Sequence, residues 1–111
     1  MTGDSNPNCD PLYGQVDALL ELLTKSKSLH ILMILDKKNR SLRFSEIKDR
    51  VDASSTTVSR RLSELIDFDL VERTKTSDES KTYEYAISDY GKQLSPIMHS
   101  FYAWVKSRNS D

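Results

Sequence analysis

The residue types that could do chemistry gather in one segment, residues 54–68. Val58 and Leu62 lie four residues apart there and begin an apolar stripe of helical spacing. At about 100° per residue, Arg60 points away from this stripe and Arg61 flanks it. An α-helix fits the major groove of duplex DNA, where the planar fork of an arginine can meet two acceptors of guanine at once. The segment is therefore predicted to be a helix that reads base edges from its N-terminal half.

Hydroxyl groups and further basic side chains surround these two arginines. Short hydroxyl residues let the start of a helix approach the groove, and the free amide groups there can bind a phosphate. Basic residues in the strand-like runs 70–76 and 82–87 can contact the duplex backbone on either side of a polar tip. The expected DNA-binding residues are Arg43, Ser54, Ser55, Thr56, Thr57, Ser59, Arg60, Arg61, Arg73, Lys75 and Lys81.

A solubility role on an exposed surface is the alternative for Arg60 and Arg61, and also for Arg43. The order of elements favours DNA contact, because a short helix, a turn, an arginine-bearing helix and a basic hairpin follow one another. Asp78 and Glu79 lie at the tip of the hairpin. The strands, rather than the tip, are therefore expected to touch DNA.

The elements that must position these residues follow from hydrophobic periodicity and from capping residues. Ser45 is the expected cap of the third helix, and Pro96 falls about two turns into the last helix, which it is predicted to bend. The apolar run 29–35 is expected at the centre of the core. The predicted elements are a helix from about Pro11, a helix through 29–35, a strand at 41–43, helices at 44–51 and 54–68, a hairpin at 70–87, and a last helix capped by Ser88 and Asp89.

This order is that of a winged helix-turn-helix, a mainly α-helical fold with a small β-hairpin, of the α+β class. At 111 residues the chain makes one domain, which can bury a modest core without disulfides or metal. Residues 11–107 are expected to form this domain, including flanking dimerisation helices. Residues 1–10 and 108–111 are expected to be flexible tails.

Charge is distributed unevenly along the chain. The net charge is −1, with 16 basic and 17 acidic residues in total. Residues 1–24 hold four of the acidic side chains and no Lys or Arg. The rest of the chain therefore has an excess of basic residues, and the net charge is compatible with a basic face toward a nucleic acid.

Several classes of function lack their residue patterns. The longest apolar run has seven residues, too short to span a membrane, and no basic segment precedes an apolar stretch as in a secretory signal. The single cysteine, Cys9, excludes an intrachain disulfide, and no pair of His or Cys has metal-ligand spacing. With no glycine-rich phosphate loop and no nucleophile beside a visible base, no enzyme, cofactor or metal site is predicted. A cytoplasmic protein without a membrane partner is the expectation.

Four blocks of sequence carry a family resemblance. They are LRFSEI at 42–47, VSRRLSEL at 58–65, LVERT at 70–74 and YAISDYG at 85–91. In order and spacing they resemble the HxlR-type branch of the MarR-like winged-helix transcription regulators, over about residues 12–105. The resemblance implies a winged-helix regulator whose partner is double-stranded DNA.

The chain departs from the family pattern at three places. Lys25, Ser26 and Lys27 stand where family members carry a Gly-Gly-Lys-Trp-like stretch. Ser80 and Lys81 stand where prolines are frequent in the wing of the family. The third departure concerns a cysteine at the start of the first helix.

Many family members carry that cysteine as a sensor of oxidants or electrophiles. Without gaps the position falls on Gly14, five residues from Cys9. Cys9 is the residue that a redox role would use. The alternative is an incidental exposed thiol, since no Lys, Arg or His lies near it in the sequence to stabilise a thiolate.

One winged helix reads a short half-site, and specificity normally comes from a dimer that spans two half-sites one helical turn apart. The first and last helices are the expected dimer surface, because the large aromatic residues of the last helix would be costly to leave in water. The alternative is that these residues close the core of the monomer. The expected dimerisation residues are Leu12, Val16, Leu19, Leu94, Met98, Phe101, Tyr102, Trp104 and Val105.

The sequence therefore predicts a homodimeric, sequence-specific transcriptional regulator that binds double-stranded DNA at a pseudo-palindromic site. Helix 54–68 is expected in the major groove, and hairpin 70–87 is expected to be a wing on the backbone. The alternative is a winged helix that serves only as a protein–protein interaction module, without direct DNA readout. No residue pattern indicates an effector.

Overall fold

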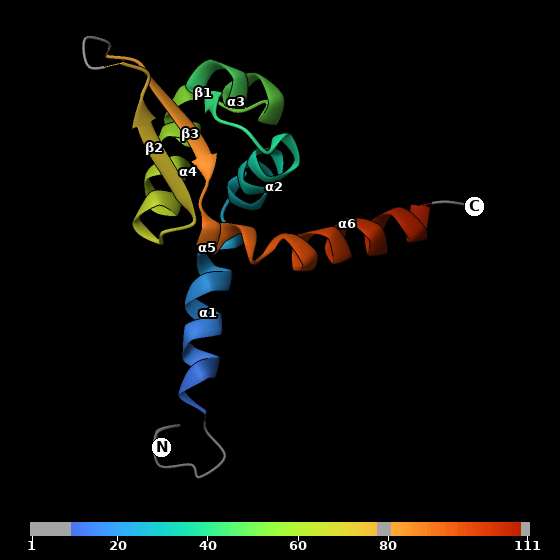
Figure 1. The fold of residues 1–111 in the computed structure, drawn as a ribbon. Helices are drawn as coiled ribbons and strands as arrows, with labels where there is room; N and C mark the ends of the chain where they lie inside the picture. Colours follow the sequence, from blue (N-terminus) through green and yellow to red (C-terminus); the bar gives the residue numbers. More distant parts are fainter. Residues whose placement is uncertain (1–9, 78–80, 110–111) are drawn as a thin grey trace.

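The computed structural model describes residues 10–77 and 81–109 and contains every predicted element, with one additional break in the last helix. A small sheet and several helices form a body, from which two helices extend (Figure 1). The described elements are α1 (Pro11–Leu23), α2 (Ser28–Lys38), β1 (Leu42–Arg43), α3 (Phe44–Val51), α4 (Ser55–Asp67), β2 (Val71–Lys75), β3 (Tyr83–Ile87), α5 (Asp89–Lys92) and α6 (Ser95–Asn109).

The core of the body is built around α2. Ile31 and Leu35 of this helix have no exposed surface, which confirms the central position predicted for 29–35. Val58 and Leu65 of α4 are also fully buried, so the apolar stripe of that helix turns inward as predicted. This burial fixes which residues of α4 face outward, since packing of an apolar face is the main source of helix stability in proteins. The other buried apolar residues are Leu22, Leu23, Leu32, Leu42, Ile47, Val51, Leu62, Leu70, Val71, Ile87 and Met98.

Three strands form an antiparallel sheet in the order β1-β3-β2. The central strand, β3, places Tyr85 opposite both Leu42 of β1 and Arg73 of β2. The predicted strand at 41–43 and the predicted hairpin at 70–87 are both confirmed. Because β1 leads directly into α3, the sheet anchors the hairpin to the helix-turn-helix.

The helix α3 begins at Phe44, before the cap predicted at Ser45, and that prediction is wrong. Its N-cap is Arg43, which keeps the extended backbone of β1 up to the first helical residue. The backbone N–H of Arg43 donates to Glu46 Oε1 over 3.1 Å. This hydrogen bond, together with one from the Arg40 guanidinium, lowers the pKa of the Glu46 carboxyl.

The last predicted helix is divided into α5 and α6. It breaks between Lys92 and Ser95, so Pro96 stands at the second position of α6. The prediction that Pro96 bends a continuous helix is therefore wrong, because near a helix start the missing N–H of proline is not needed. Close packing holds α5 against the turn before β2, where a Cβ on Gly91 would overlap the carbonyl oxygen of Leu70.

A buried serine joins α5 to the end of α4. Ser88 caps α5, as predicted, by accepting a hydrogen bond from the N–H of Gly91 over 2.9 Å. Its own O–H donates to the carbonyl of Asp69 over 2.6 Å. Ser88 thus joins the base of the hairpin and the short helix that follows it to the end of α4.

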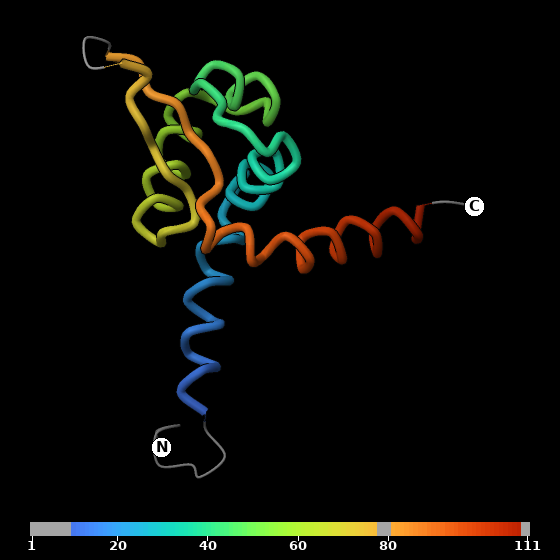
Figure 2. Tube along the Cα trace, in the orientation of Figure 1, coloured from blue at the N-terminus to red at the C-terminus, as the bar shows by residue number. Residues whose placement is uncertain are grey.

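The helices α1 and α6, the two arms of the molecule, extend from the body in different directions (Figures 1 and 2). α1 begins at Pro11, where the carboxylate of Asp10 accepts a hydrogen bond from the N–H of Leu12 over 2.9 Å. α6 continues to Asn109, beyond the domain end predicted at 107. Within residues 10–77 and 81–109, no helix has the length and apolar character needed to cross a membrane.

Candidate nucleic-acid interface

An open groove runs between α3 and the outward face of α4. Because the apolar stripe of α4 is buried, its polar residues must project from the opposite side. Four predicted DNA-binding residues come together in this groove, three with hydroxyl groups and one with a guanidinium. The residues lining the groove are Phe44, Ser55, Thr56, Ser59, Arg60 and Ser63. Ser63 follows from the outward face of α4 that the helical periodicity predicts, although it was not among the expected DNA-binding residues. Phe44 comes from α3, and only the crossing of the two helices brings it to this groove.

Arg60 is the cationic residue of this groove. It is exposed, and it forms no ion pair with any residue that the structure describes. A guanidinium has five N–H donors, which here remain free for a ligand. Its position near the N-terminal end of α4 is where helices in the major groove contact base edges.

Arg61 has a different environment from its neighbour. Its side chain is 13% exposed, and its Nε lies 3.1 Å from Oε1 of Glu64, one turn along α4. The other oxygen of Glu64 lies 3.2 Å from Nζ of Lys25, in the loop after α1. Two cations therefore share one carboxylate. The contact of Arg61 with Glu64 is an ion pair without hydrogen-bond geometry, and it lies against the body. No local pattern in the sequence indicates the contact between Lys25 and Glu64, because 39 residues separate them.

The hydroxyl groups at the start of α4 divide into a capping pair and a free pair. Ser54 Oγ accepts a hydrogen bond from the N–H of Thr57 and donates one to Thr57 Oγ1, both over 3.1 Å. This pair serves the helix cap. Ser55 and Thr56 are exposed, and their side chains make no hydrogen bond within the described part of the chain. A phosphate at this end would meet these hydroxyls and the free amides of the first turn.

The basic residues of the hairpin share one face of β2. Val71, Arg73 and Lys75 alternate with Glu72, so the acidic side chain lies on the other face. Val71 is buried against the body, and Arg73 and Lys75 continue its face toward the free end of the hairpin. The guanidinium carbon of Arg73 lies 4.5 Å from the ring centroid of Tyr83, which orders that side chain.

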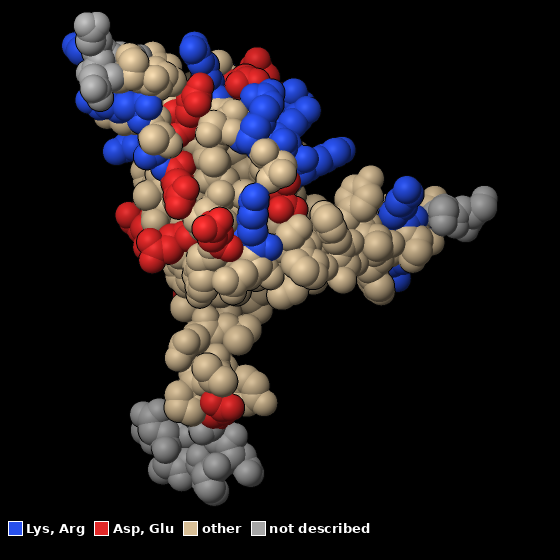
Figure 3. Space-filling view, viewed as in Figure 1, with Lys and Arg blue, Asp and Glu red and all other residues tan. Residues whose placement is uncertain are grey.

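Lys and Arg lie on several parts of the surface. Figure 3 shows them at the free end of the hairpin and over the side of the body formed by α2 and α3, whereas Asp and Glu gather on the part of the body nearer α1. Lys81 is exposed at this end of the hairpin, and Arg43 is exposed at the start of α3. The tip residues Asp78 and Glu79 lie outside the described residues, so the prediction about the tip stays a prediction.

Most of the expected dimerisation residues form an exposed apolar surface on the arms. Phe101, Tyr102 and Trp104 are 50%, 61% and 62% exposed, so they do not close the core of their own chain. Met98 was expected on this surface, and that prediction is wrong: α6 turns Met98 toward α2, where it is 2% exposed. The other members are Leu12, Val16 and Val105, which are exposed, and Leu19 and Leu94, which are half-buried.

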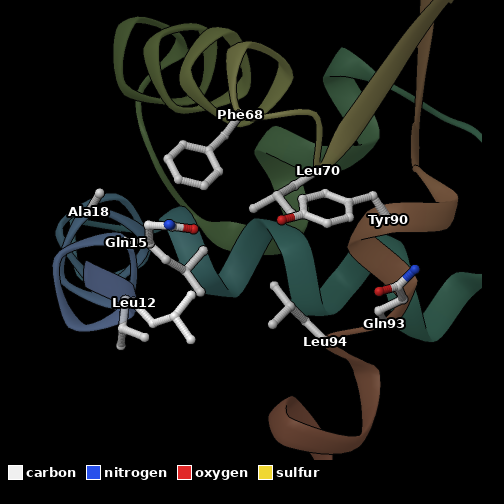
Figure 4. A pocket seen from close by; sticks show the side chains of 10 residues that line it. Leu12, Gln15, Ala18, Phe68, Leu70, Tyr90, Gln93 and Leu94 are labelled. Atoms are coloured by element: carbon white, nitrogen blue, oxygen red, sulfur yellow. The ribbon is translucent and has the colours of Figure 1, made fainter. Parts of the chain in front are cut away.

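A cavity of about 560 Å³ separates α1 from the body (Figure 4). Leu12 and Leu19 line it from α1, and Phe68, Tyr90 and Leu94 line it from the body. The α1 helix is therefore not packed flat against its own chain. Part of its apolar face remains available to another molecule.

Cys9 lies outside the described residues, so its redox role and the alternative of an incidental thiol stay predictions. Over residues 10–77 and 81–109, no group of three or more His, Cys, Asp or Glu side chains could hold a metal ion.

A family model described as HxlR-like helix-turn-helix matches residues 22–111. None of the curated proteins matches the chain.

Solved structures share the fold over most of the chain. The reduced form of the transcriptional regulator YodB from B. subtilis is 24% identical, with a TM-score of 0.70 over 81% of this chain and 87% of that one. HlyU from Vibrio cholerae N16961 is 25% identical, with a TM-score of 0.66 over 82% and 95% of the two chains. A protein described as a MarR-family regulator, from Porphyromonas gingivalis W83, is 19% identical, with a TM-score of 0.73 over 96% and 97%.

Proposed function

Because the chain belongs to the HxlR-like helix-turn-helix family, we propose that it regulates transcription as a dimer that binds double-stranded DNA sequence-specifically. In this proposal α4 enters the major groove, and the β2–β3 hairpin lies on the neighbouring sugar-phosphate backbone. The observation that carries the proposal is the outward face of α4. There Arg60 is exposed, free of ion pairs among the described residues, and flanked by small hydroxyl residues.

Arg60 is the residue proposed to read a base. A bidentate contact to guanine discriminates against other bases by about 1–3 kcal/mol. The neighbouring Thr56, Ser59 and Ser63 are short, so they let the backbone of α4 approach the edges of the base pairs. Longer side chains at these positions would hold the helix away from the groove.

The wing and the helix starts are proposed to bind phosphates. Arg73 is held in place by Tyr83, and Lys75 shares its face of the hairpin. Lys81 at the free end and Arg43 at the start of α3 extend this set. Contacts of this kind supply most of the affinity without carrying sequence information, and they weaken as the salt concentration rises.

The dimer is proposed from the apolar surface of the arms. Scattered exposed apolar residues are ordinary on a monomer, but large aromatic residues gathered on one helix usually mark an interaction site. Phe101, Tyr102 and Trp104 are such a group on α6, and α1 carries the exposed apolar residues Leu12 and Val16. A two-fold dimer would place two copies of α4 on a pseudo-palindromic site.

The test is the effect of Arg60→Ala on binding to a duplex selected from a random pool by the native protein. We expect the affinity for that duplex to fall about tenfold or more, with relaxed preference at one base pair, and the unfolding transition to stay unchanged. The matched control is Lys92→Ala, which removes an exposed cation of α5, outside the groove between α3 and α4. It should leave the affinity near the native value.

Two results would contradict the proposal. If the folded native protein prefers no duplex over another, direct DNA readout is wrong, and a protein–protein interaction module becomes the better explanation. If Arg60→Ala binds the selected duplex as tightly as the native protein does, the base-reading surface lies elsewhere.

A further inference from the structure

The helix α6 leaves the body beside Asp36, near the end of α2. The side chain of Asp36 is only 10% exposed. Its Oδ2 accepts a hydrogen bond from Ser95 Oγ over 2.8 Å and lies 3.6 Å from His99 Nε2. Ser95 is the first residue of α6, and His99 stands one turn further along. One carboxylate oxygen thus contacts two positions at the root of α6.

Helix electrostatics favours a carboxylate at this place. The N-terminal end of a helix carries partial positive charge, and α6 has no acidic residue of its own in its first turn. Asp36 supplies the negative charge from another helix. Because this side chain is largely shielded from water, its contact with Ser95 is weakened less by solvent than a contact on the surface would be.

Apolar packing alone leaves α6 room to tilt. Met98 is the buried residue among the described residues of this helix. Beside it a cavity of about 470 Å³ opens between α2 and α6, lined from α2 by Met33 and Ile34 and from α6 by Tyr102. A helix that is held by one buried side chain next to a cavity can tilt about that side chain. A second contact, at Asp36, is needed to fix the direction of the helix.

We infer that Asp36 is a positioning residue that fixes the direction of α6 and so sets the spacing of the two half-sites that the dimer accepts. α6 has 15 residues, which makes it roughly 22 Å long. A tilt of about 20° at its root would move its far end by about 8 Å, or roughly two base-pair steps. The inference rests on the proposed function, since a half-site spacing exists only for a dimer that binds DNA.

The direction of α6 can be measured in the full chain without DNA. Spin labels would be attached through Asp49→Cys on α3 and Lys106→Cys on α6, in a Cys9→Ser background. Dilution with an excess of unlabelled protein removes distances between protomers. We expect a narrow distance distribution with Asp36 present and a broadened or shifted one in Asp36→Ala. An unchanged distribution would overturn the inference.

Two further variants keep this experiment decisive. If Asp36→Ala fails to fold, Ser95→Ala removes the same hydrogen bond from the other partner and should also broaden the distribution. The matched control is Asp67→Ala, which removes an exposed aspartate at the end of α4. It should leave the distance between the labels at its native value.

The second measurement uses duplexes in which two copies of the selected half-site are separated by a series of spacers. We expect the native protein to prefer one spacing by about tenfold or more. In Asp36→Ala this preference should fall to less than about threefold, with unchanged affinity for a single half-site. An equal preference in the two proteins would overturn the inference.

Failure of the inference and failure of the proposed function give different results. If the native protein binds no duplex, the proposed function fails, and the part of the inference that concerns spacing falls with it. The label distances still decide whether Asp36 directs α6. If the native protein selects one spacing, and Asp36→Ala keeps both that spacing and the native distances, only the inference fails.

Discussion

The body and the arms of this chain use the same kind of amphipathic helix in different ways. In the body, Leu35 of α2 and Leu65 of α4 have no exposed surface. In the arms, Phe101 and Trp104 of α6 keep half of their surface or more in contact with solvent. An apolar stripe in the sequence therefore indicates that a surface will be covered, but not what will cover it.

The two adjacent arginines of α4 repeat this contrast on a smaller scale. Arg60 faces an open groove, whereas Arg61 is held by Glu64, which also binds Lys25 from the end of an arm. One residue of separation on a helix turns a side chain by about 100°. The packing of the body thus decides which of two identical side chains is available to a partner.

The largest expected effect separates a core position from an exposed arm position. Leu35→Ala should lower the free energy of unfolding by about 2–5 kcal/mol, because it removes buried methyl groups and leaves a cavity at the centre of the body. Leu12→Ala, at a position that is 58% exposed, is the matched control. Denaturant unfolding at concentrations where the chain is monomeric measures both. Similar losses in the two variants would show that α1 is part of the same core.

The next effect concerns the arm itself. Trp104→Ala should raise the dissociation constant of the dimer about tenfold or more, because large aromatic residues dominate the energy of an interface. The unfolding of the monomer should change by less than about 1 kcal/mol, since Trp104 is 62% exposed there. Sedimentation velocity over a concentration series measures the first quantity. If Trp104→Ala lowered the free energy of unfolding of the monomer as much as Leu35→Ala does, the distinction between body and arm would be wrong.

Local periodicity was enough to predict most of the body. Val58 and Leu62 are one helical turn apart and both turn inward, so the outward position of Arg60 followed from the sequence. The hairpin was predictable for the same reason, because alternation along a strand needs no knowledge of distant residues. These predictions depend on neighbours in the chain, which the sequence contains in full.

The features that could not be predicted depend on contacts between distant residues. The ion pair of Glu64 with Lys25 requires the loop after α1 to meet α4, and this contact makes Glu64 the shared partner of Lys25 and Arg61. Met98 could not be separated from the exposed residues of α6, because apolar residues occur on several sides of that helix and only its crossing with α2 chooses one. The bend expected at Pro96 failed because the sequence does not show that the chain breaks before that residue.

A third prediction sharpens the contrast between the two arginines. Arg61→Ala should weaken binding to the selected duplex by less than about threefold, against about tenfold or more for Arg60→Ala, because the guanidinium of Arg61 is already paired. Glu64→Gln is the companion variant, since it keeps the shape of the side chain and removes the charge that holds Arg61. Equal losses in Arg60→Ala and Arg61→Ala, measured by equilibrium titration, would show that the ion pair opens on DNA.

The smallest effect concerns a cap in the body and depends on pH. The Arg43 N–H, followed by the Arg40 guanidinium, lowers the pKa of Glu46 in the folded chain. The stability that this carboxylate contributes is therefore complete above its pKa in the unfolded chain, and it is lost as the pH falls through the lowered folded value. Near neutral pH the unfolding midpoint of the native chain should be higher than that of Glu46→Gln. The difference between the two midpoints should become smaller as the pH falls.

A series of urea unfolding midpoints over that pH range measures the difference between Glu46→Gln and the native chain. The matched control is Glu21→Gln, which removes an exposed carboxylate of the arm that accepts no hydrogen bond among the described residues. Its midpoint should differ little from that of the native chain throughout. If the two variants depend on pH in the same way, the hydrogen bonds to Glu46 at the start of α3 contribute no more to stability than an exposed surface charge does. The stability of the body would then come from apolar packing alone.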